Sequence, residues 1–428
     1  MNKKLPLISL FIMSIISILY WILIPKDEYY EAKWNVPDTT LAITINGEIS
    51  TTFPTTNAYT GTVECTSGTG KVEWKNSKWV LTTSAITQGG TKCNVTFNKK
   101  ITFAEIILAK NEVKAPITTP GKEESAKTEA LLASTEDDYG TSYYFRGSVT
   151  NNYVEFANKC WRIVRIGGNG AVKLILHNDN TSKATNPCDS SNNSTSAAFA
   201  RYSGAEYTSM FNPQSSDNTY VGFMYGTTGA TDYASTHANT NKSTILTNLE
   251  TWYNNNLKTY ESVIDDTVWC NDKTNITDTT YNPWDWSGVN GLGYAENATY
   301  YGATQRLVSA DGVAGGPGPS LKCNGELSKI NSKVGLITAD EIAFAGNKYG
   351  YYKYSTYLQE NATDIDWWTM SPVASRSLSV VVWAMRDSGS LITNFVYQTC
   401  GVRPSIALIS STTISGGSGT SEDPYVVN

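Results

Sequence analysis

Seven cysteines constrain the fold of this chain more than any other feature, because each disulfide holds two distant segments side by side. None belongs to a C-x-x-C motif and only two histidines accompany them, so we expect no zinc site and no other metal. We predict disulfides instead, which form outside the reducing cytoplasm. Cys65 and Cys93 stand alone in their region, and proximity in the sequence favours the other two pairs. The predicted pairs are Cys65–Cys93, Cys160–Cys188 and Cys270–Cys323, with Cys400 left over.

An apolar segment near the N-terminus favours export with a membrane anchor. Residues 5–24 carry no charge, and as a helix they would span roughly 30 Å, about one bilayer core. Lys3 and Lys4 precede this run, which predicts a cytoplasmic stub over residues 1–4 and a transmembrane anchor over residues 5–25. A cleaved signal peptide is the alternative, although no A-x-A site follows before Lys26. We therefore predict a single-pass protein of the cell membrane whose bulk is extracellular.

The next part of the chain predicts a small β domain and a linker. Apolar and polar residues alternate through most of residues 36–109, as in strands with one buried face, and turn residues separate the runs. We predict a small sandwich-like all-β domain, pinned by Cys65–Cys93, which acts as a spacer. Residues 110–138 are rich in Lys, Glu, Pro and Thr and poor in aromatic residues, which predicts a solvated linker.

Residues 139–428 predict the main domain. Strand-like runs cover residues 143–149, 152–157, 160–167 and 171–178, and the last two are joined by a Gly-rich hairpin turn. The apolar residues of 243–257 fall on one helical face. In residues 334–346, a strand is followed by a helix that begins with a capping box of Thr338 and Glu341 and stops at Gly346.

Two motifs in the main domain resemble a known fold. Residues 336–346 (LITADEIAFAG) are similar to a strand-to-helix segment of the formylglycine-generating-enzyme-like branch of the C-type lectin fold, and residues 401–404 (GVRP) resemble the end of its late hairpin region. The domain also resembles an uncharacterised family of exported proteins from Gram-positive gut-type bacteria, through residues 143–166, 268–273 and 401–408. The resemblance implies an α+β fold, a C-type-lectin-like main domain preceded by a transmembrane helix and a small all-β domain.

The C-terminal segment resembles the target proteins of diversity-generating retroelements, in which a variable stretch lies on a fixed frame. There, adenines are typically randomised in Asn codons ending in a pyrimidine, which cannot yield Lys, Glu, Gln, Met or Trp, and residues 373–382 contain none of these. The resemblance implies a variable segment over residues 373–400. The matching frame consists of Trp367, Trp368, Ser371, Pro372, Val382, Trp383, Gly389, Leu391, Val396 and Gly401 to Pro404.

A hairpin end on a rigid sheet can present side chains without disturbing the core, and such surfaces resemble paratopes. We therefore predict a face that binds an unknown extracellular protein or glycan. The alternative is that residues 378–385 form a buried strand, which their run of valines also suits. The predicted ligand-binding residues are Val373, Ser375, Arg376, Val381, Ala384, Arg386, Ser390, Ile392, Asn394, Phe395, Tyr397 and Thr399.

Other function classes find less support in the sequence. A net charge of -6 offers no basic field for nucleic acid, and no phosphate-binding or dinucleotide motif points to a cofactor, so we expect neither. The fold's copper-dependent oxidase uses two cysteines, whereas Cys400 has no nearby partner. His177 and His237 lie beside no nucleophile turn, so we do not expect an enzyme. A structural envelope or appendage protein without a specific ligand remains the alternative.

The roles of Arg403 and of four aspartates have two interpretations each. Arg403 of the GVRP motif is expected to hold a carboxylate within the fold, and the other reading is an anion ligand. Calcium is the alternative role for four aspartates, although they lack the close spacing of a calcium loop. These are Asp272, Asp285, Asp340 and Asp366.

Overall fold

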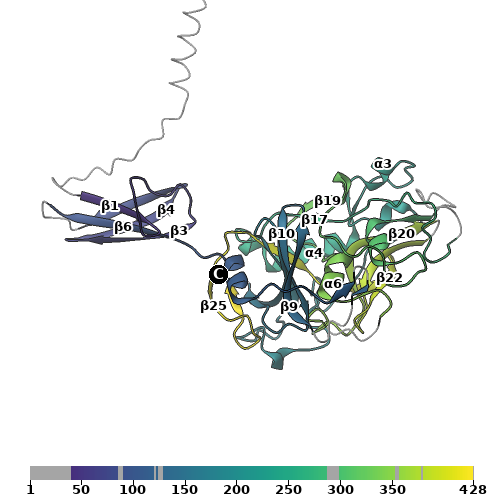
Figure 1. Ribbon diagram of the computed structural model, residues 1–428. Helices are drawn as coiled ribbons and strands as arrows, with labels where there is room; N and C mark the ends of the chain where they lie inside the picture. Colours follow the sequence, from purple (N-terminus) through teal and green to yellow (C-terminus); the bar gives the residue numbers. More distant parts are fainter. Residues whose placement is uncertain are drawn as a thin grey trace, which may run out of the picture. The chain divides into compact units, whose positions relative to one another are not determined.

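The computed structural model of the protein divides into two units, Met1–Lys100 and Ile101–Asn428 (Figure 1). It describes residues 40–84, 90–119, 122–123, 129–286, 298–351, 356–376 and 379–427. Strand accounts for 39% of the described residues and helix for 15%, so the protein is mostly β and the expected α+β class is wrong. The described part of unit 2 has only a few short helices, because most of the segments between its strands form turns and further short strands.

The described residues of unit 1 form strands and turns, as their alternating pattern predicts. Its main sheet has the order β2-β1-β6-β3, in which β1 and β6 are parallel, and β4 and β5 form a separate hairpin. Gly61 lets the two layers approach, because a Cβ there would lie 2.4 Å from Val72 of the hairpin. The strands are β1 (Thr40–Ile45), β2 (Glu48–Ser50), β3 (Tyr59–Cys65), β4 (Thr69–Lys75), β5 (Lys78–Ser84) and β6 (Lys92–Lys99).

Unit 2 begins with helix α2 (Phe103–Lys110) and is built around an eight-stranded sheet. The sheet has the order β24-β13-β12-β11-β26-β25, and β10 joins β12 to β9. Val154 of β11 and Tyr425 of β26 are parallel partners, while the other pairs are antiparallel. The strands are β9 (Ala130–Asp137), β10 (Gly140–Gly147), β11 (Tyr153–Phe156), β12 (Lys159–Ile166), β13 (Val172–Asn178), β24 (Ser405–Leu408), β25 (Ile414–Gly416) and β26 (Tyr425–Val427).

A second, six-stranded sheet carries the C-terminal hairpins. Its order is β14-β23-β20-β21-β22, with β18 paired to β20, and the β20–β21 register shifts on both sides of Pro372. Figure 1 shows its strands β20 and β22 at one side of unit 2 and strands β9 and β10 of the large sheet toward the other. The strands are β14 (Thr208–Met210), β18 (Ala298–Tyr300), β20 (Trp367–Arg376), β21 (Ser379–Met385), β22 (Leu391–Phe395) and β23 (Thr399–Gly401).

Short helices and ribbons complete unit 2. Helix α6 has the predicted capping box of Thr338 and Glu341, and Gly346 ends it in the left-handed conformation. The helices are α3 (Tyr233–His237), α4 (Thr244–Asn256), α5 (Gly302–Leu307), α6 (Ala339–Ala345), and the 3-10 turns η1 (Ser190–Asn192), η2 (Asn218–Val221), η3 (Lys258–Tyr260) and η4 (Glu326–Ser328). The ribbons pair β7 (Thr118–Thr119) with β8 (Lys122–Glu123), β15 (Met224–Tyr225) with β16 (Asn241–Lys242), and β17 (Thr267–Cys270) with β19 (Lys329–Ser332).

The boundary between the units differs from the expected one. The sequence predicts a β domain to residue 109 and a linker over residues 110–138, whereas unit 2 already begins at Ile101. Phe103 of α2 is fully buried and packs against Tyr425. Residues 130–137 form β9, which pairs along its whole length with β10. The charged residues of this stretch obscured a strand in which the consecutive residues Leu132 and Ala133 are buried.

The predicted membrane anchor, residues 5–25, and the cytoplasmic stub lie outside the described residues. Within the described ranges, no helix has both the length and the apolar character that a membrane crossing requires. This finding contradicts the predicted single-pass location in the cell membrane, while the disulfides favour an extracellular protein. The extracellular location rests on three disulfides, Cys65–Cys93, Cys160–Cys188 and Cys270–Cys323, which match the predicted pairs.

Candidate functional site

The predicted binding residues do not form one surface. Three are half-buried (Arg376, Arg386 and Asn394) and three are exposed (Phe395, Tyr397 and Thr399). The other six are buried: Val373, Ser375, Val381, Ala384, Ser390 and Ile392. Buried side chains cannot contact a ligand at the surface of this structure, so only the first two groups are accessible.

The burial of β20 and β21 explains this outcome. Successive residues of a strand face opposite sides of its sheet, yet residues 367–375 and 380–385 are buried without interruption. Both faces of these strands are therefore covered. Helix α5 contributes, since the amide of Tyr301 and the hydroxyl of Thr304 both donate to the carbonyl of Val373, at 3.1 and 2.8 Å. The buried strand considered as the alternative for residues 378–385 is what the described residues 379–385 form.

An exposed apolar group remains at the turn between β22 and β23. The rings of Phe395 and Tyr397 stack with centroids 5.6 Å apart and planes 17° apart, and they are 36% and 46% exposed. Thr399 pairs with Met210 of β14, whose side chain is 42% exposed. We call Met210, Phe395, Tyr397 and Thr399 the hairpin patch. Met210 was not predicted, because nothing in the sequence places β14 beside β23.

The turn that carries the patch is held firmly from below. Val396 lies between the two aromatic residues and is fully buried. Its amide donates to the carbonyl of Val380 at 3.1 Å, and its carbonyl accepts from the amides of Phe211 and Asn212. Gln398 closes the turn, since its amide donates to the carbonyl of Phe395 at 2.9 Å. The patch is therefore presented on a fixed backbone.

The frame predicted from the sequence is the buried base of this hairpin. Trp367, Trp368 and Trp383 are all buried, and the indole of Trp368 donates to the carbonyl of Ser209 at 2.8 Å. Gly401 is required by close approach, because a Cβ at this position would lie 2.7 Å from the ring of Phe199. These residues fix the sheet from which the patch projects.

Cys400 is a buried free thiol beside the patch. The side-chain amide of Asn394 donates to its sulfur at 3.2 Å. Burial raises the pKa of Cys400 to about 12, so the thiol keeps its proton at neutral pH. A protonated and buried thiol is a poor nucleophile, and this geometry gives no support to cysteine chemistry.

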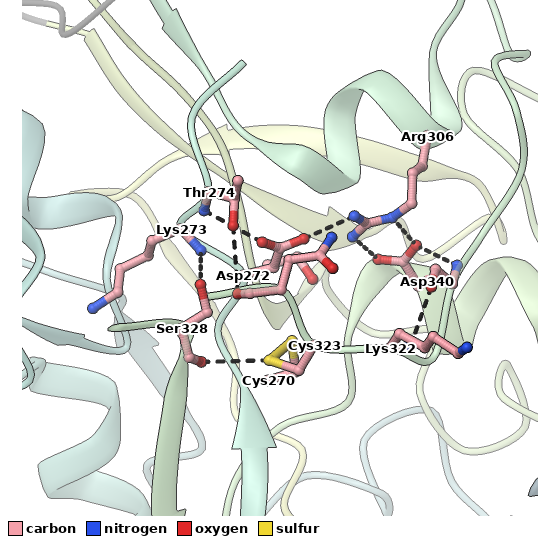
Figure 2. Close-up of polar contacts among 12 residues, drawn as sticks. Cys270, Asp272, Lys273, Thr274, Arg306, Lys322, Cys323, Ser328 and Asp340 are labelled. Atoms are coloured by element: carbon pink, nitrogen blue, oxygen red, sulfur yellow. Dashed lines mark hydrogen bonds and ion pairs between the residues drawn. A yellow bond between two sulfur atoms is a disulfide. The ribbon is translucent and has the colours of Figure 1, made fainter. Parts of the chain in front are cut away.

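A second candidate site is a polar recess between β17, α5 and α6. It is a small cavity of about 60 Å³, open to solvent at its mouth. Figure 2 shows Arg306 between two carboxylates: its Nε and Nη2 donate to Asp340 at 2.7 and 2.8 Å, and its Nη1 donates to Asp272 at 2.8 Å. The disulfide Cys270–Cys323 lies at the same recess. The motifs of residues 268–273 and 336–346, far apart in sequence, meet here.

The rest of the recess is also lined by paired charges. Glu341 accepts from Lys173 at 2.7 Å and from Arg165 at 2.9 Å, and Arg165 also binds Asp137 at 2.9 Å. Burial alone would raise the pKa of Glu341, but Lys173 and Arg165 outweigh it and lower that pKa to about 2. These charges satisfy one another, so their first role is to join β12, β13 and α6.

The four aspartates considered for calcium do not form a cation site. Asp272 and Asp340 come together, but the guanidinium of Arg306 lies between them, where a cation would bind. Asp285 and Asp366 lie elsewhere. Among the described residues, no group of three or more His, Cys, Asp or Glu side chains is arranged to hold a metal ion.

Both histidines are buried away from any catalytic arrangement. Burial lowers the pKa of His237 to about 3, and its Nε2 lies 3.3 Å from the hydroxyl of Tyr301. Lys273 is buried nearby and donates to the carbonyls of Met224 and His237 and to Asn239. Burial lowers its pKa to about 7, and its three acceptors give it a structural role.

Comparison with protein-family models, with curated proteins and with solved structures finds no match to this chain. The resemblances drawn from the short motifs therefore stay predictions.

Proposed function

We propose that the protein is an extracellular binding protein, which recognises its ligand through the hairpin patch and does not transform it. The observation that carries the proposal is the exposure of the stacked pair Phe395 and Tyr397 on a turn anchored by buried Val396. Aromatic side chains with two rotatable bonds supply contact area at a low entropic cost, and they dominate binding hot spots.

The polar neighbours of the pair fit the same role. Thr399 and Gln398 are exposed at the turn, and Asn394 is half-buried beside it. Hydroxyl and amide groups provide adaptable hydrogen bonds around an aromatic centre, as in antibody binding surfaces. The ligand is therefore a protein or a glycan, since both offer apolar faces next to hydrogen-bonding groups.

We also propose that sequence variation, if the gene is a retroelement target, is confined to the surface of this turn. Changes at Phe395, Tyr397 and Thr399 would alter mainly the contact surface, because these side chains are exposed, whereas Gln398 also accepts from the amide of Phe395. Changes at buried Val373 or Val381 would cost core packing. The burial pattern thus narrows the variable segment of residues 373–400 to its last part.

The decisive binding experiment is a screen of the full-length protein against arrays of glycans and of extracellular proteins, followed by affinity measurements on the ligand found. The triple variant Met210→Ala, Phe395→Ala, Tyr397→Ala should weaken binding by at least about tenfold, the effect of losing about 1.4 kcal/mol. Tyr139→Ala is the matched control, since this aromatic residue is 56% exposed at the mouth of the polar recess. A loss with Tyr139→Ala alone would move the site to the recess and refute the hairpin patch.

Variation is tested by amplicon sequencing of the 3′ end of the gene from one source population. The proposal expects substitutions concentrated in codons 394, 395 and 397–399, with Val396 and the tryptophan frame unchanged. A uniform 3′ end would refute the diversification hypothesis, and the protein would then bind with a fixed specificity.

A further inference from the structure

Arg403 carries a buried positive charge without an acidic partner. Its side chain is fully buried, and its Nε donates to the carbonyl of Leu176 at 2.9 Å while its Nη1 donates to the carbonyl of Leu358. Its Nη2 has no hydrogen-bond partner in the described part of the chain. The carboxylate expected for this arginine is therefore not what it binds. The Trp367 ring, 5.0 Å from the guanidinium, attracts the charge but does not neutralise it.

Two further buried donors without partners belong to the same neighbourhood. The carbonyls that Arg403 binds belong to the residues adjacent to His177 and Tyr357. The hydroxyl of Tyr357 and Nδ1 of His177 are buried and have no partner among the described residues. The side-chain amide nitrogen of Asn361 lies 3.2 Å from Nε2 of His177, and because this nitrogen only donates, the contact favours the tautomer in which Nε2 accepts. The neutral ring then carries its proton on Nδ1, so this nitrogen is a donor.

The local charge does not balance. Arg162 stacks 3.7 Å above the ring of Tyr153 and lies 5.4 Å from that of Tyr357, so it faces the same region. It is paired with Glu360 at 2.5 Å, and the carboxylate of Glu360 is 43% exposed. Among the described residues, two guanidinium groups thus face this region with a single carboxylate, which is bound to Arg162 and partly screened by solvent. Burial lowers the pKa of Arg403 to about 9, so the group is still charged at neutral pH.

Each of the three unpartnered groups is a hydrogen-bond donor that lacks an acceptor among the residues that the structure describes. A guanidinium N–H only donates, and the Nδ1–H of a neutral histidine also only donates. Burial raises the pKa of Tyr357 above its usual value, so its hydroxyl keeps its proton and can donate as well. A water molecule would bring two hydrogens of its own to a place already rich in donors. An anion would satisfy the donors and the charge together.

We propose that a small monovalent anion, of which chloride is the type, binds at Nη2 of Arg403 between the segments that carry His177 and Tyr357. The site is separate from the hairpin patch and does not depend on the proposed function. The anion would tie β13, the segment around Leu358 and the GVRP motif, and so would stabilise unit 2 rather than take part in recognition.

The test measures the melting temperature of unit 2 in sodium chloride and in sodium gluconate at equal ionic strength. Since binding to the native state alone raises stability with ligand concentration, chloride should raise the melting temperature by about 2–4 °C in a saturable manner. Tyr357→Phe, which keeps the ring and removes one donor, should reduce this increment by at least half. Tyr253→Phe is the matched control, because Tyr253 also has a buried hydroxyl without a partner but lies on α4.

Crystals grown in bromide provide the second measurement. An anomalous bromide peak within hydrogen-bond distance of Nη2 of Arg403 is expected in the wild type. Equal melting temperatures in the two salts, or ordinary water density at Nη2 without an anomalous peak, would overturn the proposal. So would an increment in Tyr357→Phe that equals that of the wild type.

Discussion

Arg306 and Asp340 form a two-pronged ion pair, in which Nε and Nη2 of the guanidinium donate to the two carboxylate oxygens at 2.7 and 2.8 Å. Arg306 lies on α5 and Asp340 in the first turn of α6. The third nitrogen binds Asp272, which follows β17. One side chain thus joins three elements at the polar recess, and its geometry favours arginine over lysine.

Replacing Arg306 by methionine should destabilise unit 2 strongly. The change leaves the carboxylates of Asp272 and Asp340 buried without their cationic partner, which typically costs about 3–5 kcal/mol. Urea unfolding followed by tryptophan fluorescence measures the loss. Lys242→Met serves as the control, since its pair with Glu250 is exposed and is worth less than about 1 kcal/mol. An equal loss of unfolding free energy in the two variants would show that the buried pairs of Arg306 stabilise the protein no more than an exposed pair does.

The stability of unit 2 should fall in acid because of Glu341. Its pKa lies near 2 in the folded protein and near 4.5 in the unfolded chain, so the unfolded state takes up the proton first. The stabilisation is complete above about pH 4.5 and is lost as pH falls toward 2, and its size is on the order of 3 kcal/mol. Between pH 2 and 6, the free energy of unfolding should depend less on pH in Glu341→Gln than in the wild type. Glu73→Gln, which changes a half-buried carboxylate of unit 1, should leave the pH dependence of unit 2 unchanged.

Two disulfides of equal span allow a matched comparison of the units. Cys65–Cys93 and Cys160–Cys188 are both separated by 28 residues, so their removal should cost a similar amount, about 3–4 kcal/mol. The double variant Cys65→Ala, Cys93→Ala should lower only the melting transition of unit 1, and Cys160→Ala, Cys188→Ala only that of unit 2. Calorimetry distinguishes the two transitions. A single transition that moves with both variants would contradict independent units.

The thiol of Cys400 should not react with thiol reagents in the native protein. Burial removes access and raises its pKa to about 12, so little thiolate forms at pH 8. Titration with a chromogenic disulfide reagent should detect no fast-reacting thiol in the folded protein and one per chain after denaturation. Rapid labelling of the folded protein would show that the β22–β23 turn opens.

The sequence predicted local features well where the physical cause is local. The capping box of Thr338 and Glu341 and the stop at Gly346 are confirmed because a helix end is decided within one turn. Helix α4 is confirmed because its buried residues, Ile245 to Tyr253, follow helical spacing. The disulfide pairs are confirmed because each joins cysteines that are near one another in sequence.

Features that depend on distant contacts could not be predicted. Val373 and Val381 were expected on a binding surface, but helix α5 and other segments of unit 2 bury them. No local sequence pattern indicates that both faces of β20 and β21 are covered by other segments. In the same way, 34 residues separate Arg306 from each of its partners, Asp272 and Asp340, so only the fold brings the three together. Met210 enters the hairpin patch through a strand pair that its sequence context does not reveal.

The pairing of β26 with β11 has a consequence for the order in which the protein is made. Val154 and Tyr425 are parallel neighbours, and β26 also joins β25 to the large sheet. A growing chain must pass residue 427 before this sheet is complete, and contacts between such distant strands form slowly. The described strands of unit 1 lie between Thr40 and Lys99, so they can pair before the last strands of unit 2 are made. Every strand that the structure describes in unit 1 is therefore made before β26, and the large sheet of unit 2 stays incomplete for longer.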